Sequence, residues 1–162
     1  MLEKSLNETL ILKKSAFFPK VYKSSLKRYS VTLGVGGNLG DLVRRLEKLS
    51  HFFHRSSLCD LIQTGPILKN PPFGYLEQDD FHNSVFLVKT NLQPQAFLKY
   101  ILEVERKFGR KRSFPNAPRT LDIDMIFYEN RTMNTKKLTL PHPFWKERES
   151  VLIPMAYMER CK

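Results

Sequence analysis

Residues 29–53, YSVTLGVGGNLGDLVRRLEKLSHFF, decide the fold. The first eight residues are mostly β-prone and end on glycines, which is typical of a strand that runs into a turn. Apolar residues then recur at helical spacing: Leu39, Leu42, Val43, Leu46, Leu49 and Phe53. This spacing predicts a helix over 39–53. The chain therefore contains a strand, a glycine-rich turn and an amphipathic helix in direct succession.

The elements that follow predict an α+β fold. Three more strands and one more helix are expected in the order strand, strand, helix, strand, over 56–63, 81–90, 94–108 and 121–128. Pro94 suits the first position of the helix, and Gly109 suits the residue that follows its end. The resulting order βαββαβ is the ferredoxin-like pattern, an antiparallel sheet with helices packed on it.

Loops and a leading segment complete the expected organisation. Residues 64–80 are rich in Pro and Gly and predict one long loop, a length that is usually functional or disordered. Residues 110–120 predict a second loop. Residues 1–28 carry scattered charge without a clean period and are expected to be an N-terminal extension. Residues 29–162 are then expected to form a single domain.

The charge is divided unevenly along the chain. The net charge is +11, and the basic segment 105–119 runs directly into the acidic segment 120–130. A uniform basic coat would indicate a nucleic-acid partner. Adjacent basic and acidic segments instead indicate an anion site beside a cation site, so we expect no nucleic-acid partner.

Nothing in the sequence indicates a membrane or secreted protein. The longest apolar run of the first 28 residues is Leu10-Ile-Leu12, which is too short for the core of a signal peptide. No apolar run reaches the ~20 residues that span a bilayer. Cys59 and Cys161 do not form a disulfide framework. We expect a reduced, cytoplasmic protein without membrane contact, and a monomer.

The acidic segment carries the strongest chemical signal. Asp122 and Asp124 alternate with Leu121, Ile123, Met125 and Phe127, so on a strand the carboxylates share one face and the apolar residues share the core face. Magnesium relieves the repulsion between two such carboxylates and suits one or two of them plus phosphate oxygens. A solvated sheet face with salt bridges to nearby arginines is the alternative.

The basic segment indicates which anion is bound. Arg110, Arg112 and Arg119 bracket the loop that leads into the acidic strand. Guanidinium groups bind phosphate oxygens in pairs, and phosphoryl transfer needs cations gathered beside carboxylates. The glycines at 34–40 match neither the P-loop nor the dinucleotide fingerprint, and they predict a turn that a ligand can approach closely.

Four strings of the chain together resemble the 6-hydroxymethyl-7,8-dihydropterin pyrophosphokinase family. They occur in order over about residues 29–155: Gly36-Gly-Asn-Leu-Gly, Gly109-Arg-Lys-Arg, Pro118-Arg-Thr-Leu-Asp-Ile-Asp and Leu138-Thr-Leu-Pro-His-Pro. The third string is highly specific, whereas the glycine turn alone is weak.

The resemblance implies a ferredoxin-like enzyme of folate synthesis. Such an enzyme transfers the β,γ-diphosphate of ATP to the hydroxymethyl oxygen of the pterin and releases AMP, so ATP and the pterin would be its small-molecule substrates. Asp122 and Asp124 would hold two Mg²⁺ ions, and Arg110 and Arg119 would contact the phosphates during catalysis. Four further residues would contact the nucleotide: Arg112 in a mobile loop, Lys137, His142 and Arg148.

The resemblance also implies a pterin site. The Asn83 amide would bind the edge of the ring and Phe81 would stack on its face, helped by the backbone of Thr64, Gly65, Pro66 and Ile67. A planar heterocycle suits an aromatic face with convergent polar groups. The family usually has a second stacking ring where this chain has Ser150. Either the pterin is held on one face only, or Phe144 or Trp145 substitutes.

Two other functions fit parts of the sequence. An RNA-binding module has the same βαββαβ order, but its aromatic signature on a central strand is missing from Phe81-His-Asn-Ser-Val-Phe-Leu-Val. A related ATP-dependent transferase with another acceptor is the second alternative, because Ser150 departs from the pterin half of the resemblance.

Overall fold

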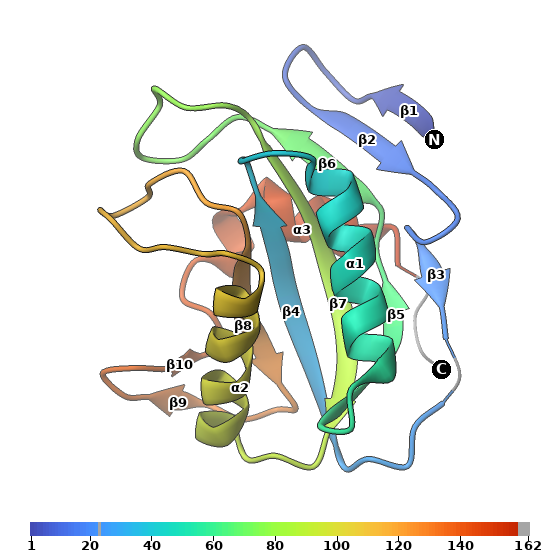
Figure 1. The fold of residues 1–162 in the computed structure, drawn as a ribbon, viewed down its shortest axis with the longest axis vertical. Helices are drawn as coiled ribbons and strands as arrows, with labels where there is room; N and C mark the ends of the chain where they lie inside the picture. The colour runs from blue at the N-terminus through green and yellow to red at the C-terminus, as the bar shows by residue number, and fades with distance from the viewer. Residues whose placement is uncertain (23, 159–162) are drawn as a thin grey trace.

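The computed structural model describes residues 1–22 and 24–158, and it builds them around one sheet. Helices α1 and α2 cover one face of the sheet, and α3 covers the other (Figure 1). The elements are β1 (Leu2–Ser5), β2 (Ile11–Lys14), β3 (Lys20–Val21), β4 (Tyr29–Gly37), α1 (Leu42–Arg55), β5 (Cys59–Thr64), β6 (Ile67–Asn70), β7 (Phe81–Thr90), α2 (Pro94–Lys107), β8 (Asp122–Tyr128), β9 (Met133–Asn134), β10 (Thr139–Leu140), the 3₁₀ turn η1 (Trp145–Glu147) and α3 (Glu149–Ala156).

The strand order is β1-β2-β6-β7-β4-β8, with antiparallel pairing throughout. Strands β5 and β6 lie end to end along β7, since β6 pairs with the beginning of β7 and β5 with its second half. β3 adds to the outer edge of β5. The expected α+β class, an antiparallel sheet with helices packed on it, is confirmed.

Helix α1 begins later than its apolar spacing predicts. The expectation was a start at Leu39, but Gly40 has φ +79 and the Asp41 side chain accepts a hydrogen bond from the Arg44 N–H at 3.2 Å. A left-handed residue and an N-cap both belong before a helix. Helix α2 begins with Pro94 as expected, and Gly109, at φ +84, follows its end as expected.

The expectation of one continuous loop over 64–80 is wrong. Ile67–Asn70 form β6, which pairs with β7 on one side and with β2 on the other. Ile67 and Leu68 are fully buried, so tertiary pairing outweighs the surrounding Pro and Gly residues. The preceding strand, expected over 56–63, runs from Cys59 to Thr64.

The segment before Tyr29 takes part in the sheet. Strands β1 and β2 form a hairpin that pairs with β6. Leu10 and Leu12 of this segment are buried against Leu68, forming a small apolar cluster apart from the main core. The separation of residues 1–28 from one enzyme domain at 29–162 stays a prediction.

A bulge changes the alternation of β8. Thr32 pairs with Phe127 and Leu33 with Met125, so Ile126 is the extra residue. Leu121, Ile123 and Met125 lie in the main core as expected. Phe127 does not, because the bulge turns it to the opposite face, where its ring contacts Trp145 at a centroid distance of 4.9 Å.

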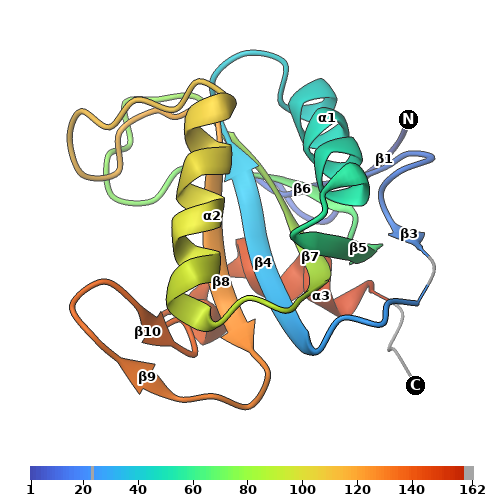
Figure 2. The same cartoon turned by 60° about the horizontal axis from the view of Figure 1, so that its bottom comes forward.

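Two long loops, 71–80 between β6 and β7 and 108–121 between α2 and β8, meet beyond the same end of the sheet (Figures 1 and 2). The Gln78 amide donates to the Asn116 carbonyl at 2.9 Å, and the rings of Tyr75 and Phe114 meet edge to face. No helix of the described chain is long and apolar enough to cross a bilayer. Cys59 is buried at the start of β5, whereas Cys161 lies outside the described residues.

Candidate functional site

Two aspartates of β8 form the centre of the candidate site. Asp122 and Asp124 share one face of the strand, as the alternation predicts, and they pair across the sheet with Gly36 and Gly34 of β4. The two glycines have no side chain to cover the carboxylates. The side chains of Asp122 and Asp124 are therefore 25% and 36% exposed on an otherwise buried sheet.

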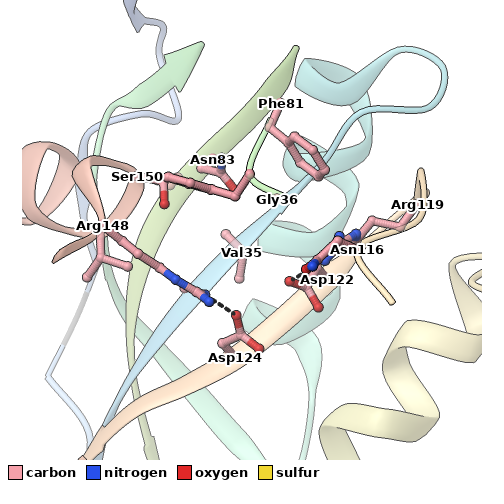
Figure 3. Close-up of a pocket in the computed structure, with 14 residues that line it drawn as sticks. Val35, Gly36, Phe81, Asn83, Asn116, Arg119, Asp122, Asp124, Arg148 and Ser150 are labelled. Atoms are coloured by element: carbon pink, nitrogen blue, oxygen red, sulfur yellow. Dashed lines mark hydrogen bonds and ion pairs between the residues drawn. The ribbon is translucent and has the colours of Figure 1, made fainter. Parts of the chain in front are cut away.

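Three arginines surround this acidic pair. Arg110 donates to Asp122 at 2.5 Å, and Arg119 contacts the other oxygen of Asp122 at 3.3 Å. Arg148 reaches across from the start of α3 to Asp124 at 3.6 Å (Figure 3). Burial, and next the neighbouring Asp122, raise the pKa of Asp124 to about 7. Three guanidinium groups thus balance the charge of two closely spaced carboxylates.

Glu105 holds two arginines of the loop that follows α2. This α2 residue is 2% exposed, and it pairs with Arg110 and with Arg112 at 3.4 Å. Burial raises the pKa of its carboxyl, while Arg110 lowers it. No role was assigned to Glu105 from the sequence. A charged residue at a core position beside a basic loop was the available signal.

One cavity lies on the α3 side of the acidic pair (Figure 3). We call it the Asn83 cavity. Its floor is β4 and its walls come from β7, β8, the two long loops and α3: Gly34, Val35, Gly36, Phe73, Phe81, Asn83, Ser84, Asn116, Arg119, Asp122, Asp124, Arg148, Ser150 and Val151. Two aromatic rings, two amides and two guanidinium groups therefore face one space beside the carboxylates.

A second cavity, the His142 cavity, shares Asp122 and Asp124 with the first. It lies between α2 and the β9–β10 hairpin, and is lined by Leu98, Leu102, Glu105, Arg112, Asp122, Ile123, Asp124, Met125, Lys136, Lys137, Leu138, Thr139, His142 and Pro143. Burial, and next Arg148, lower the pKa of His142. Its Nδ1 accepts from the Phe144 N–H, so the neutral ring keeps Nε2–H as a donor.

The expected site residues divide between the two cavities. Phe81, Asn83 and Arg119 line the first, and Arg112, Lys137 and His142 line the second. Arg148 was expected to contact a nucleotide and lies in the Asn83 cavity, whereas Arg110 reaches the site through its bond to Asp122.

No residue of the segment 64–67 lines either cavity. The Thr64 hydroxyl bonds to the Phe17 carbonyl and the Lys20 N–H, and the Gly65 carbonyl accepts from Ser84. Pro66 and Ile67 are buried. A later residue of the same connection, Phe73, lines the Asn83 cavity instead. No role was assigned from the sequence to Phe73, an aromatic residue between Pro72 and Gly74.

Phe73 also bears on the missing aromatic ring. Ser150 lines the Asn83 cavity, but neither suspected substitute does. Trp145 packs against Phe127, and Phe144 lies near His142 and Arg148. Among the described residues, the two rings of the cavity are Phe73 and Phe81, and the Arg119 guanidinium lies 5.1 Å from the Phe81 ring centroid.

The two carboxylates suit a magnesium ion whose remaining ligands do not come from the protein. Within residues 1–22 and 24–158, no group of three or more His, Cys, Asp and Glu side chains is arranged to hold a metal. Two carboxylates on a rigid strand, open to a cavity, suit a cation whose other ligands are waters and phosphate oxygens. Asp122 and Asp124 are the residues that would hold it.

Comparisons with known proteins decide the family. A model of the 7,8-dihydro-6-hydroxymethylpterin-pyrophosphokinase (HPPK) family matches residues 32–160. The chain belongs to this family. It is therefore a pyrophosphokinase, a diphosphotransferase of a family that acts on a pterin alcohol in folate biosynthesis and uses ATP as co-substrate.

Individual relatives agree with the family model. The chain is 41% identical to a 2-amino-4-hydroxy-6-hydroxymethyldihydropteridine pyrophosphokinase of Helicobacter pylori, over 90% of this chain and 91% of the relative. It is 38% identical to the protein of that name from Campylobacter jejuni, over 88% and 91%. A folic acid synthesis protein of Dictyostelium discoideum matches at 37% over 78% of this chain and 19% of its own length.

Proposed function

We propose that this member of the HPPK family transfers the β,γ-diphosphate of ATP to the hydroxymethyl oxygen of 6-hydroxymethyl-7,8-dihydropterin and releases AMP. The observation that carries the proposal is that Asp122 and Asp124 lie between two cavities of different chemistry. One has aromatic rings and an amide, and the other has cationic and apolar side chains. A reaction that joins two substrates needs such a shared centre.

The nucleotide belongs in the His142 cavity. Lys137, Arg112 and the Nε2–H of His142 are donors for phosphate or ribose oxygens, and Leu98 and Leu102 are apolar contacts for a base. The pterin belongs in the Asn83 cavity, where Phe73 and Phe81 offer ring faces and Asn83 offers an amide. The two substrates then meet at Asp122 and Asp124.

The residues act mainly through charge and position. The pterin oxygen attacks the β-phosphorus in line, a bond from that oxygen to the β-phosphorus forms, and the bond to the oxygen of the α-phosphate breaks, which leaves AMP. Arg110 and Arg119 neutralise phosphate charge as they now neutralise Asp122. The two substrates are held in contact, which lowers the entropic barrier.

Two magnesium ions at Asp122 and Asp124, when bound, would supply charge neutralisation for the phosphates. The carboxylates would hold the cations, and the arginines that pair with them in the present structure would then be free to contact phosphate oxygens. Asp124 also lines both cavities, so we propose that it accepts the proton of the attacking hydroxyl.

The proposal extends to the topology of the core, the oligomeric state and the location of the protein. The strand and helix order β4-α1-β5-β7-α2-β8, with β8, β4, β7 and β5 as neighbours, supports the ferredoxin-like reading of the core. We also propose a cytoplasmic monomer without a nucleic-acid partner. Size-exclusion chromatography with light scattering tests the oligomeric state.

A product assay tests the reaction. The purified chain is incubated with ATP, MgCl₂ and 6-hydroxymethyl-7,8-dihydropterin, and nucleotides are separated by anion-exchange chromatography. We expect AMP to appear only when both the pterin and magnesium are present, and EDTA to stop its formation. ADP as the product, or AMP formed without the pterin, would contradict the proposal.

A further inference from the structure

The orientation of the Asn83 amide is fixed by a second asparagine. Asn70, the last residue of β6, is 2% exposed. Its Nδ2 donates to the Pro71 carbonyl at 3.0 Å, and its Oδ1 accepts from the Asn83 Nδ2 at 2.7 Å. A carbonyl oxygen can only accept, so Pro71 determines which way the Asn70 amide faces, and Asn70 determines which way the Asn83 amide faces.

This relay turns the Asn83 oxygen toward the cavity floor. Gly36 pairs with Asn83 across the sheet, and a methyl group on Gly36 would collide with the Asn83 Oδ1. Figure 3 shows Asn83 beside Gly36 at the cavity. Among the described residues, no N–H or O–H group donates to this oxygen. A hydrogen-bond acceptor of fixed orientation therefore remains available to a ligand.

We propose that Asn70 is a positioning residue that makes Asn83 select a heterocycle whose bound edge carries N–H donors. An amino group beside a ring N–H is such an edge, and a ring with a carbonyl oxygen in place of the amino group would set lone pairs against the Asn83 Oδ1. The inference rests on the proposed function, because it assumes that the Asn83 cavity binds the acceptor ring.

Two ring compounds differ at this group and at the neighbouring N1: 6-hydroxymethylpterin carries a 2-amino group and an unprotonated N1, and 6-hydroxymethyllumazine carries a 2-oxo group and an N1–H. Their dissociation constants are measured by calorimetry on the wild-type chain and on Asn70→Ala, with MgCl₂ and a non-hydrolysable ATP analogue present. We expect the wild type to prefer the amino ring at least tenfold. In Asn70→Ala the Asn83 amide can rotate, so the preference should fall about tenfold.

The ratio of the two constants separates positioning from a structural role. A merely structural role of Asn70 would weaken both rings equally and leave the ratio unchanged, which would overturn the proposal. Asn70→Asp is the matched variant: it loses the donor to the Pro71 carbonyl, but either carboxylate oxygen can still accept from the Asn83 Nδ2. We expect Asn70→Asp to keep the preference for the amino ring. Equal loss of preference in both variants would also overturn the relay.

A measurement without substrate separates this inference from the proposed function. The side-chain N–H protons of Asn83 are followed by NMR hydrogen exchange in the ligand-free chain. We expect the bond to Asn70 to slow exchange in the wild type about tenfold relative to Asn70→Ala. Equal exchange would overturn the relay even if the pterin binds, whereas slow exchange with no binding of either ring would overturn only the proposed function.

Discussion

The candidate site has a sheet-borne part and a loop-borne part that differ in how firmly they are held. Phe81, Asn83, Asp122 and Asp124 stand on paired strands, and Phe81 is only 8% exposed. Phe73, on a loop, is 50% exposed. A catalytic group must be held in place before the substrate arrives, whereas a group that closes over a substrate must be able to move. We therefore expect larger losses from changes in the sheet-borne part.

The largest effect is expected at the acidic pair. Asp122→Ala or Asp124→Ala should lower turnover by about 10³-fold or more, since several kcal/mol of charge stabilisation are lost. Magnesium-dependent nucleotide binding should weaken, while circular dichroism should show an intact fold. Steady-state AMP formation measures the first effect and calorimetry the second. Near-wild-type turnover of either variant in magnesium would remove that aspartate from the cation site.

Arg110 is expected to link activity and stability. Arg110→Ala should lower turnover about 10²–10³-fold with little change in pterin binding. It should also lower the free energy of unfolding by about 3 kcal/mol, because it leaves the buried Glu105 without its main partner. Urea unfolding of Arg110→Ala and of Arg110→Ala with Glu105→Gln tests this, since the second change should restore much of the stability.

The control for Arg110 is Arg112→Ala. Arg112 pairs with the same Glu105, but its side chain is 65% exposed. Its loss should change stability by less than about 1 kcal/mol. Equal destabilisation by the two arginine variants would contradict the assigned role of Arg110 as the buried anchor.

The two rings of the Asn83 cavity compare the sheet with the loop directly. Phe81→Ala should weaken pterin binding about 10–100-fold, by analogy with bases that stack on aromatic side chains. Phe73→Ala should weaken it less, about 3–10-fold, because a loop residue gives up part of its contact energy on being ordered. Nucleotide affinity should barely respond to either change. Calorimetry with pterin and a non-hydrolysable ATP analogue measures both.

Phe144→Ala is the matched control for Phe73, since Phe144 is 52% exposed and lies outside the Asn83 cavity. Normal pterin binding is expected for this variant. If Phe144→Ala bound the pterin more weakly than Phe73→Ala does, Phe144 and not Phe73 would be the second stacking ring.

The smallest effect is a dependence of stability on pH. The pKa of Asp124 is about 7 in the folded chain, above its ordinary value of 3.8, so the folded state holds the proton more tightly than the unfolded state. Stability from this group is present below pH 3.8 and is lost as the pH rises toward 7. Asp124→Asn should therefore raise Tm at pH 8 by about 2–4 °C and leave it unchanged below pH 4. An equal gain at both pH values would contradict the assignment.

The shared face of Asp122 and Asp124 was predicted from the sequence because strands place alternate residues on one face. Phe81 and Asn83 were named from the family resemblance alone, and both line the Asn83 cavity. Helix α2 was predicted at both ends because Pro94 and Gly109 have backbone requirements that few other positions satisfy. Each of these signals is local in the chain.

The features that the sequence analysis predicted wrongly or missed depend on contacts between residues that are distant in the chain. Strand β6 forms because β2 and β7 pair with it on either side, and no local pattern records those partners. The bulge at Ile126, which turns Phe127 away from the core, depends on the register of β4. Asn70 and Glu105 are defined by their partners Asn83 and Arg110, so their importance is visible only once the chain is folded.

The β1–β2 hairpin determines what happens when the N-terminal residues of this chain are removed. It occupies the outer edge of β6, and β6 ends at Asn70. A chain that began at Tyr29 would expose the backbone N–H and C=O groups along the outer edge of β6 and the side chain of Leu68. An exposed sheet edge of this kind can pair with another copy of the chain, so self-association is expected. Solubility would then fall, and the strand that ends in Asn70 would keep only its pairing with β7.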